Sequence, residues 1–126
     1  MTTAELFSDV ESKEKLVDLL NNNLTDTGLR ITFKNVRKEG NYIVGEISAH
    51  WEENVLGKRI VLIDQDIPFR VTGRQEIYST EIPLAFGLRI KVHVDAYYDP
   101  PNKACIEARA EWPGGSVGST PVCTTF

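Results

Sequence analysis

The two histidines of the chain, His50 and His93, are the residues whose type and surroundings come nearest to catalytic or metal-binding chemistry. Each lies in a segment that alternates apolar and polar residues, which is the signature of a strand with one buried face. On the first segment, His50 shares its polar face with Glu46, Ser48 and Glu52. His93 shares a polar face with Asp95 and, across a predicted turn, with Glu107 and Arg109. The candidate polar site combines the two faces and consists of His50, His93, Asp95, Glu107 and Arg109.

If these two faces met in a cleft, they would supply imidazole and carboxylate ligands for a metal, or an acid and base pair. No feature of the sequence indicates that they meet, and no His-x-His or His-x-x-x-His spacing is present. Cys105 and the serines lack the motif of an activated nucleophile, and the glycine-rich run at 114–118 lacks the helix and lysine of a phosphate-binding loop. We therefore predict no metal, no cofactor and two solvated polar faces.

The strand that carries His93 belongs to a predicted hairpin over residues 88–112, with its turn at 99–102. Its register follows from matching apolar to apolar residues, because a slip of one position would turn each apolar side chain to water. This register places Asp95 opposite Glu107, a pair of like charges that costs stability unless neighbouring basic groups offset it. The other expected pairs are Tyr98 with Ala104, Ala96 with Ile106, Val94 with Ala108, Val92 with Ala110, Ile90 with Trp112, Lys91 with Glu111 and His93 with Arg109.

The apolar face of this hairpin has low relief, because alanines alternate there with bulkier side chains. The simplest occupant of the remaining space is an amphipathic helix expected over residues 3–24. The alternative is an apolar pocket between sheet and helix, with Trp51, Tyr98 and Trp112 at its rim, a composition typical of small-molecule sites.

The bulk properties restrict the partners and the compartment. At 126 residues with a formal net charge of −4, the chain is one domain without the basic footprint of a nucleic-acid binder. The first residues do not resemble a signal peptide, and no stretch is apolar enough to span a membrane, so we expect a cytoplasmic protein. Cys105 and Cys123 fit free thiols there, and a disulfide between them requires the C-terminal segment to fold back.

Beyond the helix, three segments share the pattern Gly-x-Arg-Ile-x-apolar, beginning at Gly28, Gly57 and Gly87. Each is expected to open a strand, a polar turn and a second strand, with turns at 38–41, 64–66 and 99–102. The three hairpins indicate either a six-stranded antiparallel meander or a three-fold repeat.

These elements predict an α+β fold, in which an N-terminal helix packs on a curved, mostly antiparallel sheet or barrel of about six strands. A sandwich or prism of three hairpins is the alternative. Residues 60–63 are apolar at every position, which is typical of a strand covered on both faces. Phe33 is expected to lie across from Gly45.

Residues 1–113 are expected to form the domain and residues 114–126 a Gly/Ser-rich tail. The tail has too few apolar groups to offset its ordering entropy, so we expect it to be mobile. Alternatively, Val122 and Phe126 anchor it on a neighbouring protein as an added strand.

Three functional hypotheses follow. The leading one is a non-enzymatic binding or assembly module that acts through contacts with another protein or with itself. The second is a carrier of a small apolar ligand in the pocket between sheet and helix. The third is a small enzyme that uses His50 or His93 with nearby carboxylates.

Overall fold

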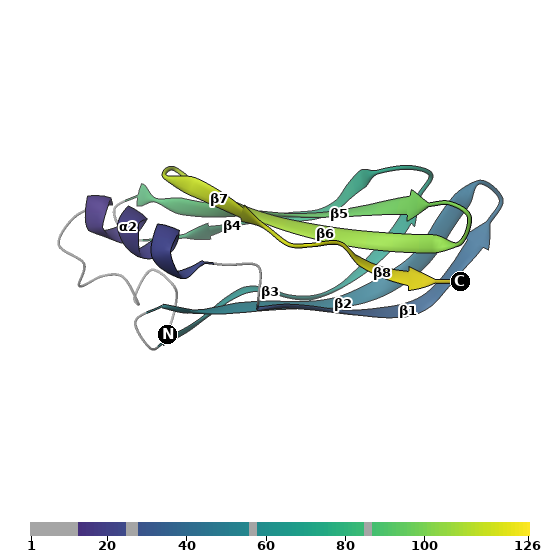
Figure 1. The fold of residues 1–126 in the computed structure, drawn as a ribbon, viewed down its shortest axis with the longest axis horizontal. Coiled ribbons are helices and arrows are strands. Elements are labelled where there is room, and N and C mark those ends of the chain that lie inside the picture. The colour runs from purple at the N-terminus through teal and green to yellow at the C-terminus, as the bar shows by residue number, and fades with distance from the viewer. Residues whose placement is uncertain (1–12, 25–27, 56–57, 85–86) are drawn as a thin grey trace.

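Two antiparallel sheets face each other in this protein, seen in a computed structural model that describes residues 13–24, 28–55, 58–84 and 87–126. The elements are α2 (Lys13–Asn23), β1 (Leu29–Glu39), β2 (Tyr42–Val55), β3 (Lys58–Val71), β4 (Gln75–Pro83), β5 (Arg89–Asp99), β6 (Lys103–Trp112), β7 (Gly115–Gly118) and β8 (Val122–Thr125). The first sheet has the order β1-β2-β3, and the second has the order β4-β5-β6-β7, with β8 also paired to β6 (Figure 1). The sheets are open, so the predicted barrel is wrong.

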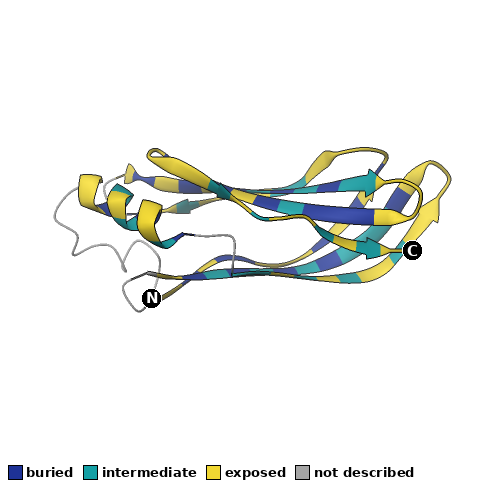
Figure 2. Cartoon of the chain, viewed as in Figure 1, coloured by how far each residue is buried: buried dark blue, intermediate teal, exposed yellow. Residues whose placement is uncertain are grey.

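The core lies between the two sheets, because each sheet turns its apolar face toward the other. Along β2, the side chains of Ile47, Ala49 and Trp51 are buried, and along β5 those of Val92 and Val94 are buried. Figure 2 shows the resulting alternation of buried and exposed residues in both layers. Burial of this apolar surface stabilises the fold by about 25 cal/mol for each Å² removed from water.

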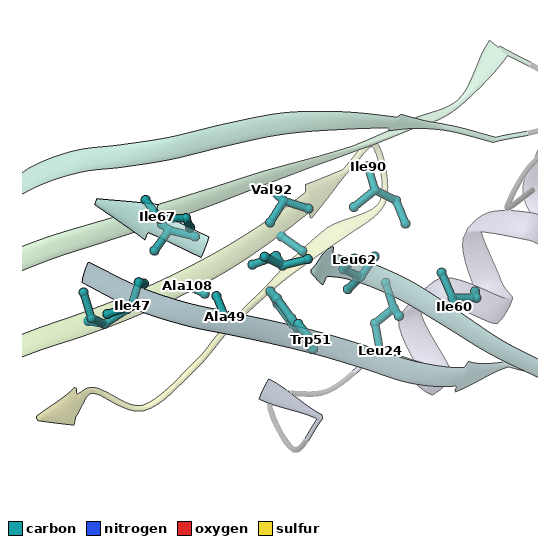
Figure 3. Packing of buried hydrophobic residues seen from close by; sticks show 14 of the residues in the cluster. Leu24, Ile47, Ala49, Trp51, Ile60, Leu62, Ile67, Ile90, Val92 and Ala108 are labelled. Atoms are coloured by element: carbon teal, nitrogen blue, oxygen red, sulfur yellow. The ribbon is translucent and has the colours of Figure 1, made fainter. Parts of the chain in front are cut away.

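The low-relief alanine face of β6 is covered by the first sheet, not by the helix. Figure 3 shows Ala108 of β6 beside Ala49 of β2, with Trp51 further along the same strand. Trp51 is fully buried in this shared core. The prediction that a helix fills the space over the alanines is therefore wrong, because a second sheet face buries more apolar surface there.

Helix α2 lies at one end of the two layers, where Leu16 and Leu20 are fully buried in the same core (Figure 1). A side chain at Gly114 would collide with Val17, so the helix and the end of β6 approach closely. The predicted helical residues 3–12 lie outside the described residues. No helix in the described part of the chain has the length and apolar content needed to cross a membrane.

The register predicted for the 88–112 hairpin is confirmed. Strands β5 and β6 pair with Val94 opposite Ala108, His93 opposite Arg109 and Asp95 opposite Glu107. Further predicted pairs that the structure contains are Tyr98 with Ala104, Ala96 with Ile106, Val92 with Ala110 and Lys91 with Glu111.

The predicted turn at 64–66 is wrong, because β3 runs unbroken from Lys58 to Val71 and pairs with β2. Strands β3 and β4 belong to different sheets, so the second predicted hairpin does not exist. The run of apolar residues at 60–63 was expected to be covered on both faces of the sheet, but the structure gives another reason for it. The register of β3 shifts at Leu62, between the pairs Trp51–Ile63 and Glu52–Val61, and this bulge turns both Leu62 and Ile63 inward.

The aromatic ring over Gly45 comes from Phe69, not from Phe33. Gly45 pairs with Phe69 of β3, and a Cβ atom at Gly45 would lie 3.0 Å from the tip of the Phe69 ring. Phe33 instead pairs with Ile47. The prediction failed because β2 pairs with both β1 and β3, and it is β3 that places a ring over the glycine.

The C-terminal segment forms the edge of the second sheet, so the predicted mobile tail is wrong. Strand β7 pairs with one half of β6 and β8 with the other half. Ser119 continues the ladder between them, since its N–H donates to the Ala108 carbonyl at 2.8 Å and its Oγ accepts from the Ala108 N–H at 2.9 Å. The division into a domain of residues 1–113 and a tail of residues 114–126 stays a prediction.

The two cysteines form a disulfide, and the prediction of free thiols is therefore wrong. Cys105 of β6 and Cys123 of β8 pair directly across the ladder, with Cα atoms 4.1 Å apart. The bond follows from the return of the C-terminal segment, which the composition of that segment did not predict.

We expect loss of the disulfide to destabilise the protein through the closed loop that it forms. The Cys105→Ser/Cys123→Ser variant should lose about 3 kcal/mol of unfolding free energy, because the unfolded chain regains its loop entropy. Urea unfolding with and without a thiol reductant measures this effect. The double variant is its own control, since a reductant should change only the wild type, and equal midpoints for the oxidised and reduced wild type would contradict the expectation.

Candidate functional site

The two predicted histidines lie on the outer faces of different sheets. His50 of β2 stands between the buried Ala49 and Trp51, so its side chain points away from the core. His93 of β5 stands in the same way between the buried Val92 and Val94. Because the inner faces of the sheets meet, the outer faces look in opposite directions, and the structure does not bring His50 and His93 together.

The His50 face is organised around one carboxylate, that of Glu52. His50 Nε2 lies 2.8 Å from Glu52 Oε1, and Arg30 and Arg59 each reach the carboxylate at 3.2 Å. Asp64 of β3 lies 3.5 Å from the other imidazole nitrogen. These residues line a shallow depression of about 670 Å³ on the outer face of the first sheet.

The partners of Glu52 determine what it can do chemically. The hydrogen bond with His50 is the largest cause of a lowered pKa for Glu52, with the charges of Arg59 and Arg30 adding to it against the opposing effect of desolvation. A carboxylate with a lowered pKa is a weaker general base, because proton transfer to it is less favourable. The geometry therefore makes Glu52 an ion-pairing centre on an exposed face.

The outer face of the second sheet holds a second cluster, centred on Arg74 from the connection between β3 and β4. Arg74 makes two contacts to the Glu107 carboxylate, at 3.1 and 3.2 Å, and one to Asp95 at 3.3 Å. Its guanidinium lies 4.3 Å from the centre of the Tyr97 ring. Arg74 thus bridges the like-charged Asp95 and Glu107 and offsets part of their repulsion. Arg109 pairs with Glu111 at 2.8 Å.

The pKa shifts in this cluster follow from these contacts. The hydrogen bond from Arg74 is the largest cause of the lowered pKa of Glu107. The same hydrogen bond is the largest cause of the raised pKa of Arg74. Burial is the largest cause of the raised pKa of Tyr97, whose hydroxyl donates to Glu107 at 3.3 Å. No local pattern around Arg74 indicates its role, since its partners lie 21 and 33 residues away along the chain.

Four of the five predicted polar residues therefore lie on one face. They line a small depression of about 120 Å³ together with Arg74. The members are His93, Asp95, Glu107 and Arg109. His93 itself contacts Glu76 of β4 through Nδ1 and lies 3.8 Å from Glu111 through Nε2. His50 belongs to the other sheet and is not part of this cluster.

The three predicted aromatic residues occupy separate environments. Trp51 is fully buried, and its indole N–H donates to Glu53 at 2.9 Å. Trp112 lies near the helix, where its indole N–H donates to Asn21 at 2.8 Å. Tyr98 lies at the other end of the hairpin, with its ring centre 6.0 Å from that of Phe126. They do not come together around one pocket between helix and sheet.

Among the described residues, no three His, Cys, Asp or Glu side chains are arranged to hold a metal ion. No protein-family model, curated protein or solved structure matches this chain.

We expect the Arg74 cluster to stabilise the fold in a pH-dependent way. Because the pKa of Glu107 is lowered in the folded state, its ionised form stabilises that state above the ordinary glutamate pKa of about 4.3. This contribution disappears as the pH falls through the lowered folded-state value. Glu107→Gln should thus be less stable than the wild type at neutral pH, and the two should converge in acid.

Urea unfolding between about pH 3 and pH 7 measures this convergence. Glu81→Gln is the matched control, because Glu81 is an exposed carboxylate on β4 that pairs with Arg89 at 2.8 Å, outside the Arg74 cluster. A stability difference between Glu107→Gln and wild type that stays constant across the pH range would contradict the expectation.

Proposed function

We propose that this protein is a non-enzymatic binding module, which recognises a partner protein by adding an extended segment of that partner to the free edge of β1. Strand β1 pairs with β2 on one side, and no described residue pairs with its other side. Its pairing with β2 is regular from Leu29 to Lys34, before the register shifts toward Arg37. An extended segment therefore has six residues of regular edge available to it, and main-chain hydrogen bonds supply the affinity in this mode of recognition.

The observation that carries this proposal is the incomplete burial of the inner face of β1. Leu29, Ile31 and Phe33 point toward the core but are only partly buried. On the neighbouring strand, their partners Trp51, Ala49 and Ile47 are almost completely buried. An added strand would cover this apolar surface, which is a favourable term in binding.

The other edges carry features that discourage strand addition. Strand β3 has Pro68 and a bulge at Leu62. Strand β4 ends at Pro83 and has a register shift between Glu76 and Tyr78. The fourth edge is divided between the short strands β7 and β8. Prolines, bulges and short edge strands are devices that proteins use to prevent pairing at an edge. Strand β1 has such an irregularity only beyond Lys34, outside its regular stretch.

Self-association through β1 is unfavourable in the register that places the two-fold axis at Thr32. In a symmetric antiparallel pairing centred on Thr32, Arg30 of one copy would face Lys34 of the other. Like charges directly opposite each other destabilise a ladder. Transport of a small apolar ligand and catalysis at His50 or His93 stay alternative hypotheses, without an observation that favours them.

We expect strand addition to be detectable with a random peptide library displayed on phage. Peptides selected on the wild-type protein should protect from hydrogen exchange those backbone amides of residues 29–34 that point away from β2. The Ile31→Lys variant should bind them about tenfold to a hundredfold more weakly, because one buried apolar side chain is worth about 1.5 to 3 kcal/mol.

Thr32→Lys is the matched control, since it adds the same charge to the outer face of the same strand. Circular dichroism and thermal unfolding establish that both variants are folded. Selected peptides that protect other strands, or that bind Ile31→Lys as tightly as wild type, would contradict the proposal.

A further inference from the structure

The charges of β1 indicate the chemistry of its partner. Strand β1 contains four basic residues and one acidic residue, although the whole chain has a net charge of −4. Its basic residues are Arg30, Lys34, Arg37 and Lys38, all exposed. Basic residues therefore outnumber acidic ones along β1 on an otherwise acidic protein, although Arg30, Lys34 and Arg37 each pair with a carboxylate of the same sheet. This excess of basic residues along the edge favours an acidic partner.

The two basic residues on the regular part of the edge pair with carboxylates of the same sheet, but their side chains remain exposed. Arg30 reaches Glu52 at 3.2 Å with 74% of its side chain exposed, and Lys34 lies 3.9 Å from Asp66 with 44% exposed. Exposed ion pairs of this kind contribute little to the stability of the fold, so exchanging them for new partners costs little. A carboxylate arriving at the edge can accept a hydrogen bond from either side chain without breaking the core.

Alternation along β1 assigns a face to each residue of the incoming strand. Arg30, Thr32 and Lys34 lie on the outer face, whereas Ile31 and Phe33 lie on the inner face. In a strand added beside β1, side chains on the two faces also alternate, and directly opposite residues share a face. Acidic residues would thus pair with Arg30 and Lys34, and apolar residues with Ile31 and Phe33.

The apolar side chains of a strand added beside β1 would pack against the second sheet. Its edge strands β7 and β8 lie on the same lateral side as β1, because β3 and β4 are in contact and occupy the opposite side. Val117 and Phe126 on this side are also only partly buried. The disulfide from Cys123 to Cys105 fixes β8 in this position.

We infer that the partner of this protein presents an extended segment in which acidic residues alternate with apolar residues, and that this segment binds along Leu29–Lys34. This inference rests on the proposed strand addition and adds the chemical class of the segment. The acidic residues select the partner, and the apolar residues cover the half-buried inner face of β1.

Two fluorescently labelled peptides test the inference on the oxidised full chain, one of alternating valine and glutamate and the other of alternating valine and lysine. Fluorescence anisotropy at low salt should give a dissociation constant about tenfold lower for the glutamate peptide, since two cross-strand charge pairs change sign between the peptides. The ratio should shrink as salt is raised, because exposed charges are screened over about 10 Å at 0.1 M ionic strength.

The Arg30→Glu/Lys34→Glu variant should reverse this preference and bind the lysine peptide more tightly. Lys13→Glu/Lys15→Glu on the helix is the matched control, because it changes the net charge equally at a different place and should leave the preference unchanged. Thermal unfolding establishes that both double variants are folded.

The outcomes separate this inference from the proposal beneath it. Equal binding of both peptides at residues 29–34, or a preference that both double variants change equally, would overturn the charge selection and leave strand addition intact. Absence of binding by both peptides, together with failure of the library selection, would overturn both.

Discussion

The mutual burial of two sheet faces is the constraint on which the rest of this structure depends. Trp51 lies completely within the shared core, and its indole N–H donates to the buried carboxylate of Glu53. A buried polar group needs a hydrogen-bond partner, and the two residues meet because they lie two positions apart on one face of β2. Small side chains such as Ala49 and Ala108 allow the layers to approach around the indole (Figure 3).

The same constraint explains why the edges of the sandwich differ. A sheet of three strands faces a sheet to which five strands contribute, and the inner side chains of β1 remain partly exposed at one side. Strand β2, between two neighbours, is buried on its inner face. The inner side chains of β1 are therefore only partly covered by the fold, as are those of the other edge strand β4.

The outer faces show how ion-pair networks can resemble a catalytic set. Histidines and carboxylates alternate there because the outer positions of both sheets are polar. Arg74, in the connection between β3 and β4, contacts Asp95 of β5 and Glu107 of β6. Glu52 plays a similar part on the first sheet, where it gathers His50, Arg30 and Arg59. Both clusters join neighbouring strands on the surface.

Sequence alone determined the features that depend on neighbouring residues. Alternation assigned each side chain of β5 and β6 to a face, and apolar matching gave their register, because one slipped position would expose a whole row of apolar groups. It also placed His93, Asp95, Glu107 and Arg109 on one polar face, as the structure confirms.

Only the tertiary structure decided which elements meet across the chain. Whether β3 turns back at residues 64–66 or continues beside β2 depends on the total apolar surface buried, and not on the polar residues at that point. The approach of Cys123 to Cys105 and of Arg74 to Glu107 likewise requires the pairing of distant strands. The separation of His50 from His93 follows from the packing of two inner faces, because a period of two assigns a residue to a face but does not specify which sheet covers the other side.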